Sequence, residues 1–393
     1  MRVELLKRYL FVLGKNQRLS TAEIASYLRI KGLRFEMASF KGFCIAETED
    51  GDIDVKDLGG TLKVCEVLGE SLPGEFEQEI MKAIPPVKSR KGYFAVSIYG
   101  PHSEGKGYIQ TVKRLSVAIK KRLREEGSNL NFMSHRGRSY FTHTEIVKKK
   151  VLVDGFELVA GIVEGKCYIA RTLGVHDPFE FMKRDVERPA QRTMYSIPPR
   201  LALIMLNLSE PGSEGLVIDP FCGVGTIVQE MALRGLECEG SDIDADIIEA
   251  ARTNLDWLKG EYKTIREPKL FAMDARELGK KYGKESVSRI VTEPSLGPLL
   301  PKHPKKRHVE KIVEELLPQY REFFEVFREI LKEDGKVIIV FPEYRTEKGD
   351  VRIETGFLKE AGFEKVPLMG ADSFLDAEER HRVMRRIYVL RRK

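Results

Sequence analysis

The chain has 393 residues, of which 32% are charged and 42% hydrophobic, and its formal net charge is +6. This length predicts roughly two or three domains. No run of about 18 apolar residues occurs and the charged N-terminus lacks the apolar part of a signal peptide, so we expect a soluble, cytoplasmic protein without a membrane partner. The five cysteines form no Cys-x-x-Cys pair, so we predict neither a zinc site nor a disulfide framework, and no bound metal.

Residues 1–85 are predicted to form a small α+β domain. Ser20 is expected to cap a helix, because Glu23 stands three residues later and completes a capping box. Strands around this helix give a βαββ-like order, which is typical of an α+β module. Prolines and glycines between residues 73 and 86 mark the domain boundary. We expect strands at 9–13, 35–38 and 42–47, and a helix or turn at 57–68.

The second domain is expected at residues 86–176 and begins with a strongly basic stretch. Between Lys88 and Lys150 there are 15 Lys or Arg residues against four Glu and no Asp, which gives this stretch a net charge of +11. Such a block attracts polyanions. The buried stripe of its amphipathic helix is expected to consist of Val112, Leu115, Ile119 and Leu123. We expect a strand at 93–99, that helix at 110–126, a strand at 150–153 and a hairpin at 156–170.

Basic side chains on this helix and after it are interleaved with aromatic residues. Such a surface suits a phosphate backbone with exposed bases or ribose edges, so we predict that the domain binds RNA. The alternative is that the charges are only the solvated face of the helix. The residues expected to contact RNA are Lys113, Arg114, Lys120, Lys121, Arg136, Arg138, Lys148 and Lys149.

A proline-rich, charged stretch at residues 177–199 is expected to be a linker. Pro198 and Pro199 then open a helix, and strands and helices alternate from residue 200 to 393. We therefore expect an α/β fold whose C-terminal domain is a doubly wound, Rossmann-like sheet with helices on its faces. Strands are expected near 289–292, 336–341 and 386–390, the last as an antiparallel edge strand.

The segment LVIDPFCGVGT at residues 216–226 is predicted to be a buried strand, a glycine loop and the start of a helix. Glycines there let the backbone approach a ligand at the carboxyl end of the strand. A dinucleotide fingerprint needs a third glycine where Val228 stands, so that interpretation fails. The loop residues expected to bind a cofactor are Asp219, Phe221, Cys222, Gly223 and Gly225.

Acidic residues follow at the ends of the next two expected strands. Asp242 stands where a carboxylate can accept hydrogen bonds from both hydroxyls of a ribose, and Ile243 can cover one face of an adenine. Asp274, followed by Ala275, can accept a hydrogen bond from the adenine amino group. Any one of these carboxylates, taken alone, could instead cap a helix. Together with the glycine loop they predict S-adenosylmethionine as the cofactor.

Five segments carry a recognisable pattern: RDVERP (184–189), SIPPRLALIMLNLS (196–209), IDPFCGVGT (218–226), GSDID (240–244) and DAREL (274–278). Through them the chain resembles, over essentially its whole length, the archaeal tRNA guanine-N2 methyltransferases that carry a THUMP domain, typified by the enzyme acting on guanosine 10. The resemblance implies a ferredoxin-like domain, a THUMP domain and a Rossmann-like methyltransferase domain. It also implies that the first two domains grip the 3′ end and acceptor stem of a tRNA.

The catalytic segment departs from the family pattern Asp-Pro-Pro-Tyr. In that pattern the carboxylate and the next proline carbonyl hold the exocyclic amine, and the aromatic ring stacks on the flipped base. This chain has Glu293, Pro294, Ser295 and Leu296 in these places. The resemblance implies that Glu293 orients the target amine and Pro294 supplies the carbonyl, while Leu296 replaces the stacking ring. Alternatively, Glu293 only caps the next helix.

The predicted function is therefore methyl transfer from S-adenosylmethionine to the exocyclic N2 of a guanosine in tRNA. One alternative is an RNA-binding protein that keeps the cofactor fold but has weakened chemistry. The other is a methyltransferase that acts on DNA or on another nucleobase, which would leave the basic N-terminal half without a role.

Overall fold

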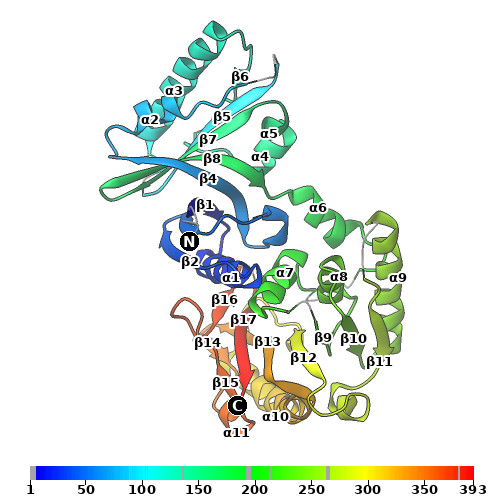
Figure 1. The fold of residues 1–393 in the computed structure, drawn as a ribbon. Helices are drawn as coiled ribbons and strands as arrows, with labels where there is room; N and C mark the ends of the chain where they lie inside the picture. The colour runs from blue at the N-terminus through cyan, green and yellow to red at the C-terminus, as the bar shows by residue number, and fades with distance from the viewer. Residues whose placement is uncertain are drawn as a thin grey trace, which may run out of the picture. The chain divides into compact units, whose positions relative to one another are not determined.

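The computed structural model describes residues 6–87, 89, 91–101, 103, 105–134, 137–191, 196–212, 214–262, 266–378 and 381–393. The chain divides into two compact units, Met1–Glu180 and Phe181–Lys393, each built around its own sheet (Figure 1). The expected mixed α/β fold is confirmed. No helix within the described ranges is long and apolar enough to span a membrane.

Eight strands build the sheet of the first unit: β1 (Lys7–Leu13), β2 (Phe35–Phe40), β3 (Phe43–Thr48), β4 (Thr61–Ser71), β5 (Tyr93–Tyr99), β6 (Asn131–Phe132), β7 (Phe156–Val163) and β8 (Lys166–Val175). Their order is β2-β3-β1-β4-β8-β7-β5-β6. β4 pairs antiparallel with β1 on one side and with β8 on the other. The strands that we expected in two separate domains therefore form one continuous sheet.

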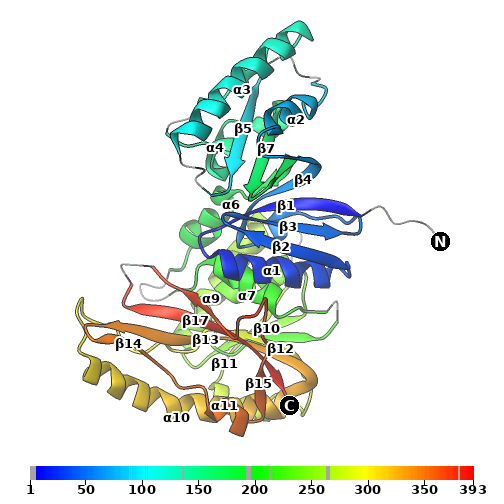
Figure 2. The same ribbon diagram turned by 90° about the vertical axis from the view of Figure 1, so that its left-hand side faces the viewer.

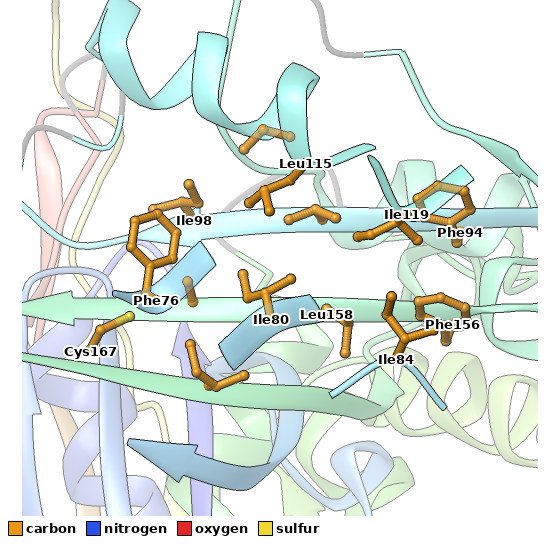
Figure 3. Packing of buried hydrophobic residues seen from close by; sticks show 14 of the residues in the cluster. Phe76, Ile80, Ile84, Phe94, Ile98, Leu115, Ile119, Phe156, Leu158 and Cys167 are labelled. Atoms are coloured by element: carbon orange, nitrogen blue, oxygen red, sulfur yellow. The ribbon is translucent and has the colours of Figure 1, made fainter. Parts of the chain in front are cut away.

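The helices of this unit are α1 (Gln17–Ile30), η1 (Val55–Asp57), α2 (Phe76–Lys82), α3 (Lys106–Glu125), α4 (His143–Lys148) and α5 (Val151–Asp154). Helix α1 contacts β1 and β2, and α3 contacts β5 (Figure 2). The expected stripe of α3 is buried, and its Leu115 and Ile119 belong to a core that also contains Phe94 and Phe156 (Figure 3).

Three local predictions for this unit are wrong. Helix α1 begins before Ser20 because the Asn16 side chain caps it, and Glu23 instead accepts hydrogen bonds from backbone N–H groups of the loop before β4. The expected helix or turn at 57–68 is mostly strand β4, because pairing on both sides outweighs local preference. The expected strand at 150–153 is helix α5, since so short an apolar run has no diagnostic period.

Nine strands form the sheet of the second unit: β9 (Leu216–Asp219), β10 (Cys238–Asp242), β11 (Lys269–Ala272), β12 (Val287–Thr292), β13 (Leu331–Thr346), β14 (Gly349–Arg352), β15 (Phe363–Lys365), β16 (Phe374–Asp376) and β17 (Val383–Arg392). The main path is β11-β10-β9-β12-β13-β17-β15, and the pairs from β11 to β13 are parallel. β17 is antiparallel to β13, as expected. It is not an edge strand, because β15 and β16 pair with its other side.

The helices around this sheet are α6 (Pro178–Met182), η2 (Lys183–Glu187), α7 (Pro199–Leu208), α8 (Thr226–Leu233), α9 (Ala245–Glu261), η3 (Ala275–Lys280), α10 (Lys306–Ile330) and α11 (Phe357–Glu360). Much of the stretch expected to be a linker packs on this unit. Arg184 is buried against Glu230 of α8, with Nε 2.8 Å from a carboxylate oxygen. Asn254 of α9 bonds both the N–H and the carbonyl of Ala190. These contacts fix the segment in front of α7.

Candidate functional site

A cavity of about 440 Å³ opens in the second unit where β9, β10 and β12 end. This volume falls in the usual range of small-molecule sites. Because parallel strands present their carboxyl ends at one sheet edge, segments far apart in the chain meet there. All residues expected to bind the cofactor or the target base line the cavity, apart from Gly225. They are Asp219, Phe221, Cys222, Gly223, Asp242, Ile243, Asp274, Ala275, Glu293, Pro294, Ser295 and Leu296.

The loop between β9 and α8 has a backbone conformation that needs its two glycines. Gly223 and Gly225 have φ values of 51° and 90°, in the left-handed region that side chains disfavour. Asn254 holds the loop from α9 by donating to the carbonyl of Val224 at 2.9 Å. The backbone N–H of Gly223 donates to Oδ2 of Asp242 at 3.1 Å. The loop is therefore tied to the end of β10.

Asp242 ends β10 without capping the helix that follows. Asp244 caps α9, because its Oδ1 accepts from the backbone N–H groups of Asp246 and Ile247. Each oxygen of Asp242 accepts one backbone hydrogen bond at 3.1 Å, from Gly223 and from Asp244. A carboxylate oxygen can accept more than one hydrogen bond, so both can still serve a ligand in the cavity. Ile243 beside it is 69% exposed.

Asp274 also lines the cavity, and it does cap a helix. Its Oδ1 accepts from the backbone N–H of Arg276 at 2.9 Å and so begins η3. The Arg276 guanidinium pairs with the same carboxylate, and this hydrogen bond lowers the pKa of Asp274 below its usual value. A ligand amine at Asp274 would share the carboxylate with Arg276.

Glu293 follows β12 and forms an ion pair that the sequence did not predict. Arg385 of β17 donates through Nε at 2.5 Å and through Nη2 at 3.2 Å to its two oxygens. Both side chains are nearly buried, with 8% of Glu293 and 11% of Arg385 exposed. Charge-assisted, two-point pairs of this kind fix orientation as well as charge. Glu293 is thus held as an oriented carboxylate and not as a helix cap.

Two tyrosines hold the backbone of the segment after Glu293. The Tyr320 hydroxyl on α10 donates to the carbonyl of Ser295 at 3.2 Å, and the Tyr344 hydroxyl on β13 donates to that of Leu296 at 2.8 Å. Gly297 then turns with φ of 81°, where a Cβ would lie 2.8 Å from the Tyr344 hydroxyl oxygen. The path of this segment, Glu293 to Gly297, is therefore set by side chains from α10 and β13.

Asp219 at the end of β9 is the most deeply buried carboxyl of the cavity wall, with 1% of the residue exposed. Its Oδ1 accepts from the Thr292 hydroxyl at 2.6 Å and from the Phe221 backbone N–H at 3.1 Å. Burial and, to a lesser extent, the negative charges of Asp242 and Glu293 together raise the pKa of Asp219 to about 7, against the hydrogen bonds from Thr292 and Phe221 that lower it. This carboxyl therefore titrates near neutral pH.

The basic residues expected on the amphipathic helix lie on α3, in the first unit. Lys113 and Lys121 are exposed. Arg114 is exposed as well, but Nε donates to Glu77 of α2 at 3.1 Å. Lys120 donates to the side-chain oxygen of Asn131 at 2.8 Å. All four lie away from the buried stripe, so the helix combines an apolar and a basic face.

The remaining expected RNA contacts follow α3 in the chain. Arg138 donates to Glu145 at 3.1 Å. Lys148, the last residue of α4, and Lys149 after it are exposed and stand over aromatic rings, at 5.5 and 5.2 Å from the ring centres. Arg136 lies outside the described residues.

Comparison with known proteins places the cavity in a methyltransferase domain. Residues 187–351 match the family model of the RMKL-like methyltransferase domain, UPF0020. A relative from Methanothermobacter thermautotrophicus, named tRNA (guanine(10)-N2)-dimethyltransferase, is 33% identical over 160 residues, which are 40% of this chain and 43% of that protein. The chain thus spans less than half the length of this curated relative.

Two solved structures share the fold along the chain. TrmN from Thermus thermophilus is 16% identical with a TM-score of 0.55, covering 98% of this chain and 100% of that one. The protein SMU.472, solved in complex with SAH, is 14% identical with a TM-score of 0.51, covering 99% of each chain. All residues that line the cavity fall inside the matched family range. The expected family resemblance is thus confirmed for this part of the chain, where residues 187–351 match the model of the UPF0020 methyltransferase domain.

Proposed function

We propose that this protein transfers a methyl group from S-adenosylmethionine to the exocyclic N2 of a guanosine in tRNA. The observation that carries the proposal is that one cavity is lined by both sets of expected residues. Asp242 is the carboxylate expected to bind the ribose of the donor, and Glu293 and the carbonyl of Pro294 are the two acceptors expected to bind the target amine. The relative named a tRNA (guanine(10)-N2)-dimethyltransferase supports the choice of substrate.

The residues of the cavity fit an adenosyl ligand. Asp242 would accept both ribose hydroxyls, and the exposed Ile243 would cover the adenine. The backbone of the loop from Asp219 to Gly225 would lie along the methionine part, while Asp274 and Ala275 would border the adenine amino group. When bound, this cofactor supplies an electrophilic methyl group on a sulfonium.

The chain itself supplies orientation for the acceptor. The lone pair of a guanine N2 is delocalised into the ring, so the amine is a weak nucleophile. Glu293 and the Pro294 carbonyl would accept its two hydrogens and turn the lone pair towards the methyl group, and positioning of this kind supplies much of a rate enhancement. The guanidinium of Arg385 holds the Glu293 carboxylate in place for this task. Leu296 offers an apolar contact in place of a stacking ring.

The first unit would bind the tRNA. It comprises the expected ferredoxin-like and THUMP domains, residues 1–85 and 86–176, and contains the basic face of α3 and the two lysines, Lys148 and Lys149, at the end of α4. Phosphate contacts from such residues provide affinity without reading sequence.

The site also favours one second candidate, an RNA-binding protein with weakened chemistry. Both oxygens of Glu293 are engaged by Arg385, and Leu296 lacks the ring that would stack on a flipped base. Under this alternative the cavity binds the donor but does not turn it over.

Incubation of the full-length protein with tRNA transcripts and methyl-labelled S-adenosylmethionine separates the two candidates. We expect label in N2-methylguanosine or N2,N2-dimethylguanosine after digestion to nucleosides. Glu293→Ala provides the control for catalysis at this cavity. Donor binding without any labelled nucleoside would favour the RNA-binding candidate, and label in adenosine or cytidine would reject guanosine as the target.

A further inference from the structure

Two of the carboxyl groups that line the cavity, those of Glu293 and Asp219, lie in different environments. Glu293 is held between its ion-pair partner and the cavity, and Asp219 is buried one strand away at the end of β9. The Thr292 hydroxyl, on the residue before Glu293, donates to Oδ1 of Asp219 at 2.6 Å. Neighbouring carboxyls that are held in different environments commonly take different tasks in a reaction.

Glu293 is poorly suited to accept a proton. Its two oxygens are bonded by the buried guanidinium of Arg385, and protonation would leave that cation without its counter-charge. The ion pair instead suits a carboxylate that stays ionised and accepts hydrogen bonds throughout the reaction. A different group must then receive the proton that the methylated amine gives up.

Asp219 is the group whose surroundings fit that need. Among the described residues, both hydrogen bonds to its side chain reach Oδ1, and none reaches Oδ2. Neither bond comes from a cation, so protonation of this carboxyl breaks no ion pair. Burial raises the pKa of Asp219 to about 7, which is where a general base works best at neutral pH.

We propose that Asp219 is the proton acceptor of the methyl transfer, a role that rests on the proposed function. As the amine nitrogen forms its bond to the methyl carbon, the carbon–sulfur bond breaks and its electron pair stays on sulfur. The nitrogen then carries one hydrogen too many. Oδ2 of the Asp219 carboxylate takes this proton and the neutral methylamino group remains. The aspartic acid returns the proton to water when the product leaves.

The groups around Asp219 fix the direction of its pH dependence. Asp242 at the end of β10 and Glu293 after β12 both disfavour its ionised form through their negative charge. The Cys222 thiol on the same loop has a pKa raised well above its usual value by burial, so it stays neutral. The buried Tyr320 hydroxyl on α10 likewise stays neutral, because burial raises its pKa well above the usual value. Only deprotonated Asp219 can accept, so the rate should rise with pH through about 7 and then level.

Single-turnover rates of the full-length enzyme on tRNA, measured from about pH 5 to about pH 9, test this role. Asp219→Asn should lower the rate about a hundredfold or more and remove the rising limb, because general bases contribute about 10²–10⁴-fold. Thr292→Val keeps the carboxylate but removes a hydrogen bond that lowers its pKa, so the limb should move to higher pH. Asp256→Asn makes the same chemical change on an exposed residue of α9 and should keep the wild-type profile.

The outcomes separate this inference from the proposed function. A wild-type enzyme that methylates tRNA while Asp219→Asn keeps the rising limb would overturn the role of Asp219 and leave the proposed function standing. An unmoved limb in Thr292→Val would overturn it as well, even where Asp219→Asn fails to fold. A wild-type protein that methylates no tRNA would overturn both. Donor affinity measured in parallel should change less than the rate in both variants, which a purely structural role would not produce.

Discussion

Arg385 changes the interpretation of the departure from Asp-Pro-Pro-Tyr. A glutamate is one methylene longer than an aspartate, and in this structure the longer side chain meets a buried guanidinium on β17. Glu293 is thus held in place by an ion pair with Arg385, although its residue type departs from the family pattern. The residues that surround the reacting groups can therefore differ from those of the family while an oriented carboxylate is retained.

Removal of the Arg385 guanidinium should show how much this ion pair contributes to stability and to the rate. Arg385→Met leaves Glu293 buried without its counter-charge, so we expect a loss of roughly 3–5 kcal/mol in the free energy of unfolding and a fall in kcat. Chemical denaturation and single-turnover kinetics measure the two effects. Arg391, which also lies on β17, forms an exposed ion pair with Glu364 of β15. Arg391→Met breaks this pair and should change neither the stability nor kcat much. Equal effects of the two variants would argue against a special role for Arg385.

Asp242 should determine donor affinity. Asp242→Ala removes both acceptors offered to the ribose, and charge-assisted hydrogen bonds contribute roughly 1.5–3 kcal/mol each. Calorimetric titration with S-adenosylmethionine should therefore show binding weakened by about a hundredfold or more. The matched change Asp244→Ala removes the cap of α9 and should cost about 1 kcal/mol of stability while donor affinity is kept. Unchanged affinity in Asp242→Ala would reject the ribose assignment.

The sequence indicates which residues meet at the cavity where the pattern is local. The glycine loop and Asp242 follow directly from strand ends, and the structure brings them to one cavity. Arg385 and Tyr344 could not be found in this way, because they reach the catalytic segment from positions 92 and 48 residues away. An arginine inside an apolar strand is a signal that a buried partner exists, but the sequence does not say which carboxylate it is.

At the scale of elements, the sequence predicted those segments whose conformation is set by their own residue pattern and missed those whose conformation is set by pairing with distant strands. Helix α3 was predicted because its apolar stripe, from Val112 to Leu123, repeats at helical spacing over about three turns. Strand β4 was missed because its conformation comes from two neighbours, one of them more than 100 residues away in sequence. The start of α1 was misplaced because two polar residues, Asn16 and Ser20, compete as caps and only the structure distinguishes them.

The basic face of α3 should control the affinity for tRNA. Reversing the charge of the exposed Lys113 and Lys121 should raise the KM for tRNA and lower the slope of log affinity against log salt by about one unit per lost phosphate contact. Donor affinity should be unchanged. Filter binding over a range of salt concentrations provides the slope. A slope equal to that of the wild type would identify these lysines as a solvated helix face.

At the scale of the whole molecule, the two proposed tasks fall on different units of the chain. The cavity and every residue expected to do chemistry belong to the second unit, and the basic stretch belongs to the first. In the first unit Lys63 of β4 and Glu157 of β7 form a buried ion pair at 2.5 Å, and Thr172 of β8 also donates to Glu157. This network joins strands from both expected N-terminal domains, so we expect them to act on tRNA as one body.

The central claim is that Glu293 orients the target amine in an active methyltransferase. Single-turnover methylation of tRNA by wild type, Glu293→Gln and Glu293→Ala measures it most directly. We expect kcat to fall in Glu293→Gln, which keeps one acceptor oxygen but loses the charge, and further in Glu293→Ala, while the affinities for donor and tRNA change little. Full activity in Glu293→Ala, or a wild-type protein without turnover on any tRNA, would contradict the account.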